Sequence, residues 1–191
     1  MKKFYQAVSV IFNPLTVLIA VYIAAIVLSF DNLADRLLWS GLVIGICFTA
    51  PALYYSYYFL HGSIDTDIKD FHKRAGLFKI AAVSFWAAYV IVLFIIEAEI
   101  LARMLLVTAL ITVAFLCVIV LFKKELSVHL SAVAFLSFFA LQYGTWKVAP
   151  FATGLIFVTA LSRYKLKMHT MDEIVGAFAI TAMVYAATAL G

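Results

Sequence analysis

The stretch LARMLLVTALITVAFLCVIVLF, from Leu101 to Phe122, decides the fold, because its only charged residue is Arg103. About 20 consecutive apolar residues make an α-helix long enough to cross the hydrocarbon core of a bilayer. Six further apolar runs are present, at residues 10–30, 37–60, 79–97, 128–143, 147–162 and 172–190. The runs are continuous and do not alternate, which favours helices over a membrane barrel. The sequence therefore predicts an all-α, polytopic transmembrane helical bundle of about six to seven spans.

The composition agrees with that fold class. Of the 191 residues, 66% are hydrophobic and only 13% are charged, about half the charged share of a soluble domain. A soluble chain of this size could not bury so much apolar surface, which excludes a secreted disulfide scaffold, a disordered chain and a nucleic-acid-binding domain. We expect a single multi-pass integral membrane domain over residues 1–191, in contact with membrane lipids, whose first span is retained.

Two of the apolar runs, residues 128–143 and 147–162, are short for full crossings. The residues between them, Gln142 to Lys147, read QYGTWK and are typical of an interfacial turn. We expect two short spans joined by this turn. One bent or re-entrant unit is the alternative.

The basic residues are distributed unevenly over the expected loops. With seven crossings, the N-terminus and the links 61–78, 122–127 and 162–172 share one face. Only three of the 14 lysines and arginines lie on the other face: Arg36, Arg103 and Lys147. The positive-inside rule then places the basic face in the cytoplasm, although residues that bind an anion would produce the same bias. The basic face also carries all four histidines: His61, His72, His129 and His169.

The link before the last apolar run is the most informative. It reads SRYKLKMHTMDE from Ser162 to Glu173, and an apolar helix containing glycine follows. This resembles the last signature, S-R-x5-H-x3-D, of the type 2 phosphatidic acid phosphatase superfamily, the lipid phosphatases related to vanadium haloperoxidases. Ser162, Arg163 and His169 match at the same spacing. Glu173 fills the acidic position, with Asp172 one place earlier.

A second signature of that family, P-S-G-H, is matched in part by the preceding link. Ser127 and His129 match it, whereas Leu126 and Val128 replace its proline and glycine. The order of the segments, and the face they share, are similar to those of the family. The resemblance covers a phosphatase-like core of about residues 61–185.

The family's first signature, K-x6-R-P, is largely eroded. Arg74 can supply its arginine, whereas Asp67 and Ala75 stand in place of its lysine and proline. The missing cation is then supplied by one of three nearby or converging lysines: Lys69, Lys73 or Lys124.

The resemblance implies a lipid phosphate or diphosphate phosphatase that uses no metal or other cofactor. His169 would attack phosphorus and form a phosphohistidine, Glu173 or Asp172 would orient its ring, and His129 would protonate the leaving oxygen. The phosphate-binding residues implied are Arg74, Arg163, Ser127, Lys69, Lys73 and Lys124. Guanidinium groups and helix N-termini suit a tetrahedral anion, and imidazole titrates near neutral pH.

Structural roles are the alternative for several of these residues. Thr170-x-x-Glu173 before an apolar run is a capping box, so Glu173 can simply hold the N-terminus of the last helix. Ser127 can be a helix N-cap. Asp65, Asp67 and Asp70 form a D-x-D pattern of the kind that holds Mg²⁺ beside a diphosphate in prenyl transfer. Pairing with nearby lysines and Arg74 is the more ordinary role for these acids.

Two other functions stay open. The first is a catalytically inactive relative of the same fold, favoured by the eroded first signature. The second is a small lipid-handling or transport membrane protein, although the scarcity of charge inside the spans argues against ion coupling.

Overall fold

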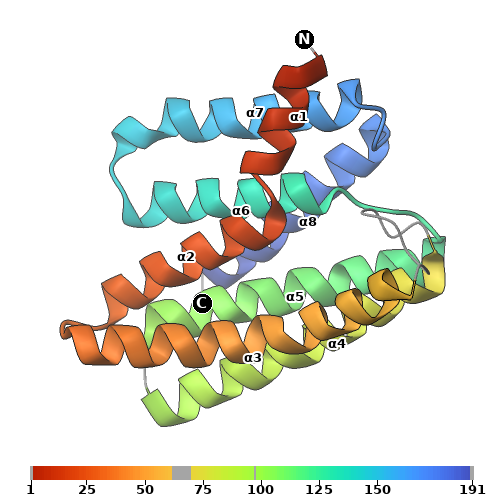
Figure 1. The fold of residues 1–191 in the computed structure, drawn as a ribbon. Helices are drawn as coiled ribbons and strands as arrows, with labels where there is room; N and C mark the ends of the chain where they lie inside the picture. The colour runs from red at the N-terminus through yellow and green to blue at the C-terminus, as the bar shows by residue number, and fades with distance from the viewer. Residues whose placement is uncertain (1, 62–69, 97, 190–191) are drawn as a thin grey trace. The chain divides into compact units, whose positions relative to one another are not determined.

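The structure is a computed structural model that describes residues 2–61, 70–96 and 98–189. It is 89% helical, and the described residues contain no strand, which confirms the all-α prediction (Figure 1). The chain divides into two compact units. One consists of residues 1–21 and 124–191, and the other of residues 22–123; each is described by itself. The single-domain expectation stays a prediction.

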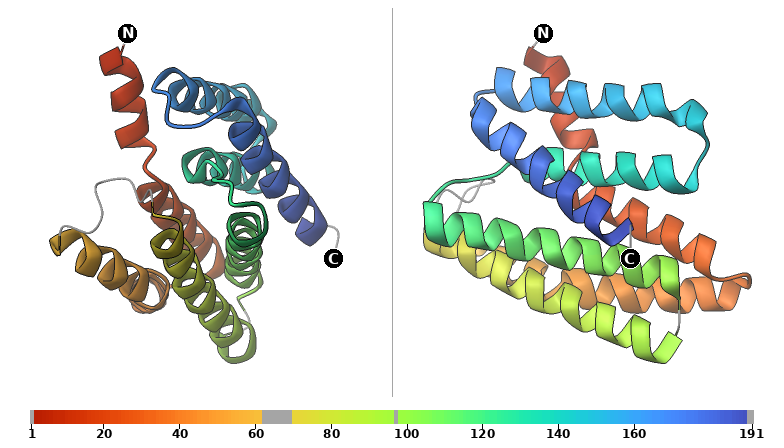
Figure 2. Two further views of the ribbon diagram at one scale, coloured as in Figure 1. Left: turned by 90° about the vertical axis from the view of Figure 1, so that its right-hand side faces the viewer. Right: turned by 180° about the vertical axis from the view of Figure 1, so that it is seen from behind.

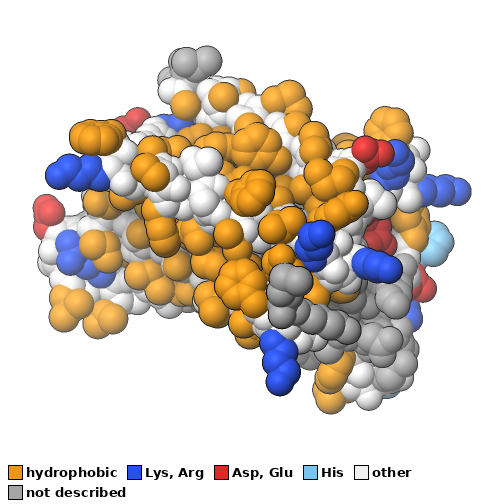
Figure 3. Space-filling model, turned by 90° about the horizontal axis from the view of Figure 1, so that it is seen from above, with side chains coloured by type: hydrophobic (Ala, Val, Ile, Leu, Met, Phe, Trp, Pro, Cys, Tyr) orange, Lys and Arg blue, Asp and Glu red, His pale blue; other side chains and the backbone are white. Residues whose placement is uncertain are grey.

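Several helices have the length and composition of membrane spans. Five such stretches lie in the described residues: Lys3–Ser29, Leu33–Leu60, Phe71–Ile96, Glu99–Phe122 and Met171–Ala189. Large apolar side chains are exposed along them, and Leu60, Phe94 and Met183 are 80%, 76% and 64% exposed. Figure 3 shows hydrophobic side chains over most of one face, with charged side chains near its edges. Water would not tolerate so much exposed apolar surface, so the protein is membrane-embedded.

The unit of residues 22–123 holds most of the long helices: α3 (Leu33–Leu60), α4 (Phe71–Ile91), a π-helical turn (Val92–Ile96) and α5 (Glu99–Phe122). The α4 helix packs along both α3 and α5. Its N-cap is Asp70, whose Oδ1 accepts the backbone N–H of Lys73 at 3.0 Å. Gly76 allows α3 and α4 to approach closely, because a Cβ at this position would overlap the hydroxyl of Tyr54.

The unit of residues 1–21 and 124–191 contains α1 (Lys2–Ile11), the first half of α2 (Pro14–Ser29), α6 (Val128–Tyr143), α7 (Ala149–Lys165) and α8 (Met171–Ala189). A break at Asn13 separates α1 from α2, since its Oδ1 accepts the N–H of Leu15 at 2.9 Å and Pro14 opens the next helix. The expected first span, residues 10–30, is therefore interrupted, and α1 packs against α7.

The two short apolar runs form two separate helices. Figures 1 and 2 show α6 and α7 as antiparallel neighbours, joined through Gly144 and a 3-10 turn over Trp146–Val148. This agrees with the expected turn, while the crossing of the bilayer by each of the two helices stays a prediction. With 16 and 17 residues, the helices are about 24 and 26 Å long, less than the roughly 30 Å of hydrocarbon.

Hydroxyl groups tie α6 to α8 inside this unit. The Oγ of Ser131 lies 2.7 Å from Oγ1 of Thr181, which in turn donates to the carbonyl of Ala177. Nearer the other end of α6, the Tyr185 hydroxyl donates to Oε1 of Gln142 at 2.5 Å. All these groups lie on apolar helices, where an unmet polar group is costly, so the bonds fix the register of α6 against α8.

Candidate functional site

Three helix ends meet at one end of the unit formed by residues 1–21 and 124–191. They are the N-terminus of α6, the C-terminus of α7 and the N-terminus of α8. The backbone N–H of Ser127, just before α6, donates to the carbonyl of Glu173 in the first turn of α8 at 3.5 Å. The links 122–127 and 162–172 thus share an end, as their positions in the sequence predict.

The link between α7 and α8 folds back on itself through a left-handed residue. Lys167 has a φ of 56°, and its N–H donates to the carbonyl of Tyr164 at 3.0 Å. The N–H of Met168 donates to the carbonyl of Arg163 at 3.1 Å. This pair of bonds is a Schellman motif, which stops α7 and turns the chain toward α8. His169 follows directly on this turn.

His169 and Glu173 are in direct contact. Nδ1 of the ring lies 3.1 Å from Oε2 of the carboxylate, and the two side chains are 9% and 21% exposed. A carboxylate only accepts hydrogen bonds, so we assign the ring proton to Nδ1, which leaves the lone pair on Nε2. The spacing of four residues across a helix start brings the two groups together.

Glu173 also forms the capping box that its sequence context allows. Its Oε2 accepts the N–H of Thr170 at 3.0 Å, and its own N–H donates to Oγ1 of Thr170 at 3.4 Å. The capping and the histidine contact therefore use the same carboxylate. Asp172 is exposed in the same turn, so of the two acids Glu173 is the one that meets His169.

Ser127 is fully buried and forms the N-cap of α6. Its Oγ accepts the N–H of Leu130 at 3.5 Å, which is the structural role considered from the sequence. His129 is the second residue of α6 and is half-buried. Both lie beside the Glu173 backbone contact, while their parts in phosphate binding and proton transfer stay predictions.

Arg163 lies at the end of α7 and is only 6% exposed. Its Nη1 donates to Oγ of Ser9 in α1 at 2.7 Å. The neighbouring Ser162, fully buried, donates its hydroxyl to the carbonyl of Tyr5 at 2.8 Å. Two adjacent residues of α7 therefore hold α1 in place.

The apolar runs of the sequence predict no role for α1. A local signal was present, because Tyr5 and Ser9 are one helical turn apart and flank Val8, which is buried. This stripe marks the side of α1 that packs on a neighbour, although the partner helix lies more than 150 residues further along the chain.

The remaining phosphate-binding candidates lie in the link before α6, in the other unit, or outside the described residues. Lys124 is exposed in the link before α6. Lys73 and Arg74 lie in the first turn of α4, in the unit of residues 22–123, where Nζ of Lys73 is 5.3 Å from the ring centre of Tyr58. Three predicted residues lie outside the described part of the chain: Asp65, Asp67 and Lys69.

The residues that the structure describes contain no group of three or more His, Cys, Asp or Glu side chains that could hold a metal ion. Asp70, the described member of the D-x-D pattern, caps α4. The backbone N–H of Lys73 donates a hydrogen bond to the Asp70 carboxylate, and this bond lowers the pKa of the carboxyl below its ordinary value.

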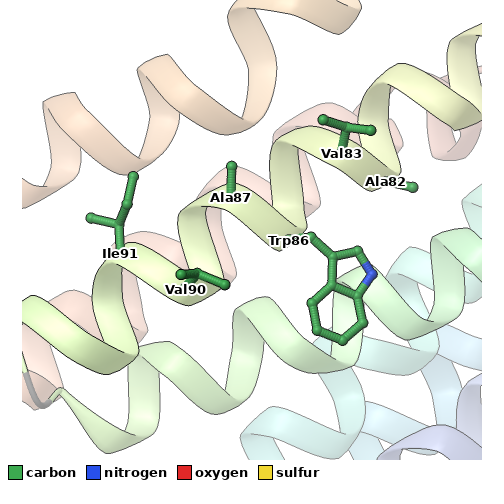
Figure 4. A pocket seen from close by; sticks show the side chains of 6 residues that line it. All are labelled: Ala82, Val83, Trp86, Ala87, Val90 and Ile91. Carbon is green, nitrogen blue, oxygen red and sulfur yellow. The ribbon is translucent and has the colours of Figure 1, made fainter.

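An apolar groove lies along α4, in the unit of residues 22–123 (Figure 4). It encloses about 570 Å³. Its lining residues are Ala82, Val83, Trp86, Ala87, Val90 and Ile91. No titratable side chain lines it, so the groove supplies no chemistry to the candidate site.

Comparison with known proteins found no match: no family model, no curated protein and no solved structure matches this chain. The family resemblance, and every role attached to it, therefore stay predictions. They rest on the residue spacing and on the geometry described above.

Proposed function

We propose that this chain is a membrane-embedded phosphatase that hydrolyses a lipid phosphate or diphosphate through a phosphohistidine at His169. One observation carries the proposal: the His169 ring contacts the Glu173 carboxylate at the end where the N-terminus of α6 meets α8. A histidine paired with a carboxylate near a helix N-terminus is a suitable arrangement for phosphoryl transfer.

In the first step, Nε2 of His169 attacks phosphorus. The bond between phosphorus and the leaving oxygen breaks, and His129 donates a proton to that oxygen, so that the lipid alcohol or lipid monophosphate departs. The Glu173 carboxylate stabilises the positive charge that develops on the His169 ring. A charged partner at 3.1 Å favours that cation.

In the second step, water attacks the phosphohistidine. His129, now neutral, takes a proton from this water, the N–P bond breaks, and the electron pair returns to Nε2 of His169. Orthophosphate is released, and both histidines regain their starting protonation states. No redox partner is needed.

The phosphate oxygens would be held by Arg163 and by the backbone N–H groups at the N-terminus of α6, which Ser127 caps. Lys124, in the same unit just before α6, would supply a supporting cation. The cation roles of Arg74, Lys69 and Lys73 stay predictions from the sequence.

The substrate would be a lipid, because the cluster lies at the end of membrane helices where phosphate head groups are found. The charge bias favours a cytoplasmic position for this end. Labelling of Lys165→Cys, at an exposed position of the α7 end, with a membrane-impermeant maleimide tests the orientation. Cys47 and Cys117 are replaced by alanine first. Reaction from the outer side of intact cells would contradict a cytoplasmic site.

Phosphate release by the purified protein in lipid nanodiscs tests the function. Phosphatidic acid and an isoprenyl diphosphate are the two probes. We expect release from at least one, and a loss of 100-fold or more in His169→Ala and in His129→Ala, while both variants keep their helical content. Activity that survives both substitutions would contradict the mechanism.

A second candidate is a catalytically inactive membrane protein of the same fold. The state of Arg163 favours this candidate. Its side chain is only 6% exposed and is hydrogen-bonded to Ser9, which suits a residue whose role is to join α7 to α1. Absence of phosphate release from both probes, in a protein that is folded and membrane-inserted, would support this candidate over the first.

A further inference from the structure

We propose that Ser9 is a positioning residue of the phosphate site, which makes the N-terminal helix α1 a part of that site. The inference rests on the phosphate-binding role proposed for Arg163. The observation behind it is the hydrogen bond that Nη1 of Arg163 donates to Oγ of Ser9 at 2.7 Å. The two residues are 154 positions apart in the chain.

The placement of Ser9 is built into the fold. Because the helix breaks at Asn13 and Pro14, α1 does not continue along the axis of α2. It packs on α7 instead. Val8 is buried in that packing, and the Ser162 hydroxyl bonds the carbonyl of Tyr5 at 2.8 Å. Ser9 lies one turn after Tyr5 and therefore reaches Arg163, the residue after Ser162.

A fixed guanidinium is a better phosphate ligand than a mobile one. Arginine loses side-chain entropy when it binds an anion, and its planar fork must face the phosphate oxygens. The Ser9 contact engages one of its five N–H donors and restricts the plane of the group. A hydroxyl can accept and donate at once, so Ser9 can hold Nη1 and also donate to a phosphate oxygen.

The test is the binding of inorganic phosphate, measured by titration calorimetry on the full chain in detergent micelles. Five proteins are compared: wild type, Ser9→Ala, Ser9→Thr, Ser162→Ala and Ser131→Ala. We expect Ser9→Ala to raise the Kd about tenfold and Ser9→Thr, which keeps the hydroxyl, to restore it to within about threefold. Ser131→Ala is the matched control, since it deletes another 2.7 Å hydroxyl contact of the same unit, between Ser131 and Thr181, in which Arg163 takes no part.

Ser162→Ala separates positioning from attachment. It removes the other bond that holds α1 on α7, without touching the guanidinium. An equal loss of affinity in Ser162→Ala and Ser9→Ala would mean that attachment of α1 alone matters, which overturns the proposal. An unchanged Kd in Ser9→Ala, or the same loss in Ser131→Ala, overturns it as well.

The binding measurement distinguishes this proposal from the proposed catalysis. Wild-type protein that binds phosphate in a manner dependent on Ser9, yet releases none from either lipid probe, would contradict the phosphatase and support the positioning role. In the opposite case, normal phosphate release together with a Kd that Arg163→Gln does not change would contradict the role of Ser9 and leave the catalysis standing.

Discussion

The Oε2 atom of Glu173 lies 3.1 Å from Nδ1 of His169 and 3.0 Å from the backbone nitrogen of Thr170. One carboxylate thus holds both a helix start and an imidazole ring. A loss of function on its removal could come from either contact. The predictions that follow separate the two.

Substitution Glu173→Gln should slow phosphate release by about 10- to 100-fold with little change in thermal stability. The amide oxygen can still accept from Thr170, so the cap is retained, whereas the negative charge beside the His169 cation is lost. Single-turnover kinetics in nanodiscs checks the rate. A larger loss in Asp172→Asn than in Glu173→Gln would show that Asp172 is the partner of His169.

Substitution Thr170→Ala should lower the free energy of unfolding by about 1 kcal/mol, because the hydroxyl that accepts the N–H of Glu173 is removed. Thermal unfolding in micelles measures the change. Thr153→Ala is the matched control, since its hydroxyl only bonds back to the carbonyl of Ala149 on the exposed side of α7. Equal destabilisation by both would contradict the capping role.

The His169 and Glu173 contact could be predicted from the sequence because it is local. The spacing of four residues, the capping pattern and the apolar run after it are all contained in Ser162 to Val175. The apolar runs likewise predict most of the helices, whereas the break at Asn13 and Pro14 falls inside the expected first span of residues 10–30. These features depend on nearby residues alone.

The docking of α1 could not be predicted in the same way. Tyr5, Val8 and Ser9 mark the packing face of α1, but the other helices are apolar on most sides, so the pattern of hydrophobic residues does not tell which neighbour that face meets. The contacts of Tyr5 with Ser162 and of Ser9 with Arg163 join the two ends of the chain. They depend on the packing of α1 on α7, which no local pattern encodes.

Substitution Gly144→Ala should destabilise the protein by more than about 1 kcal/mol. A Cβ at this position would overlap the carbonyl oxygen of Ala140, and backbone atoms cannot move aside cheaply. Gly154→Ala is the control, because nothing lies within 4 Å of its added Cβ and alanine favours a helix interior by about 0.5 to 1 kcal/mol. Unfolding temperatures that change in the same direction would contradict this account of the α6–α7 turn.

Substitution Lys167→Gly should stabilise the protein by up to about 1 kcal/mol. Lys167 has a φ of 56°, a left-handed conformation that costs an L-residue energy and costs glycine almost none. Lys165→Gly, in the last turn of α7, should instead destabilise by about 0.5 to 1 kcal/mol. Thermal unfolding of the two variants side by side checks the opposite signs.

Asp70 should contribute a stability term that is lost in acid. The N–H of Lys73 lowers the folded pKa of this carboxyl below its ordinary value of 3.8. The stabilisation is therefore complete above that value and disappears as the pH falls through the folded pKa. Asp70→Asn keeps a capping oxygen without the titration, so its unfolding temperature relative to wild type should be constant above about pH 5 and rise below it. A constant difference down to about pH 2 would contradict the role of Asp70.

The short α7 helix has a consequence for the surrounding lipid. Phe151 and Phe157 are 70% and 67% exposed, so we expect α7 to face acyl chains, yet its apolar part ends before Arg163. From Ala149 to Leu161 it spans only about 20 Å, roughly 10 Å less than the hydrocarbon core. A bilayer meets such hydrophobic mismatch by thinning beside the protein. The thinned annulus would draw phosphate head groups down to the level of His169, so a lipid would need little lifting from the membrane to reach it.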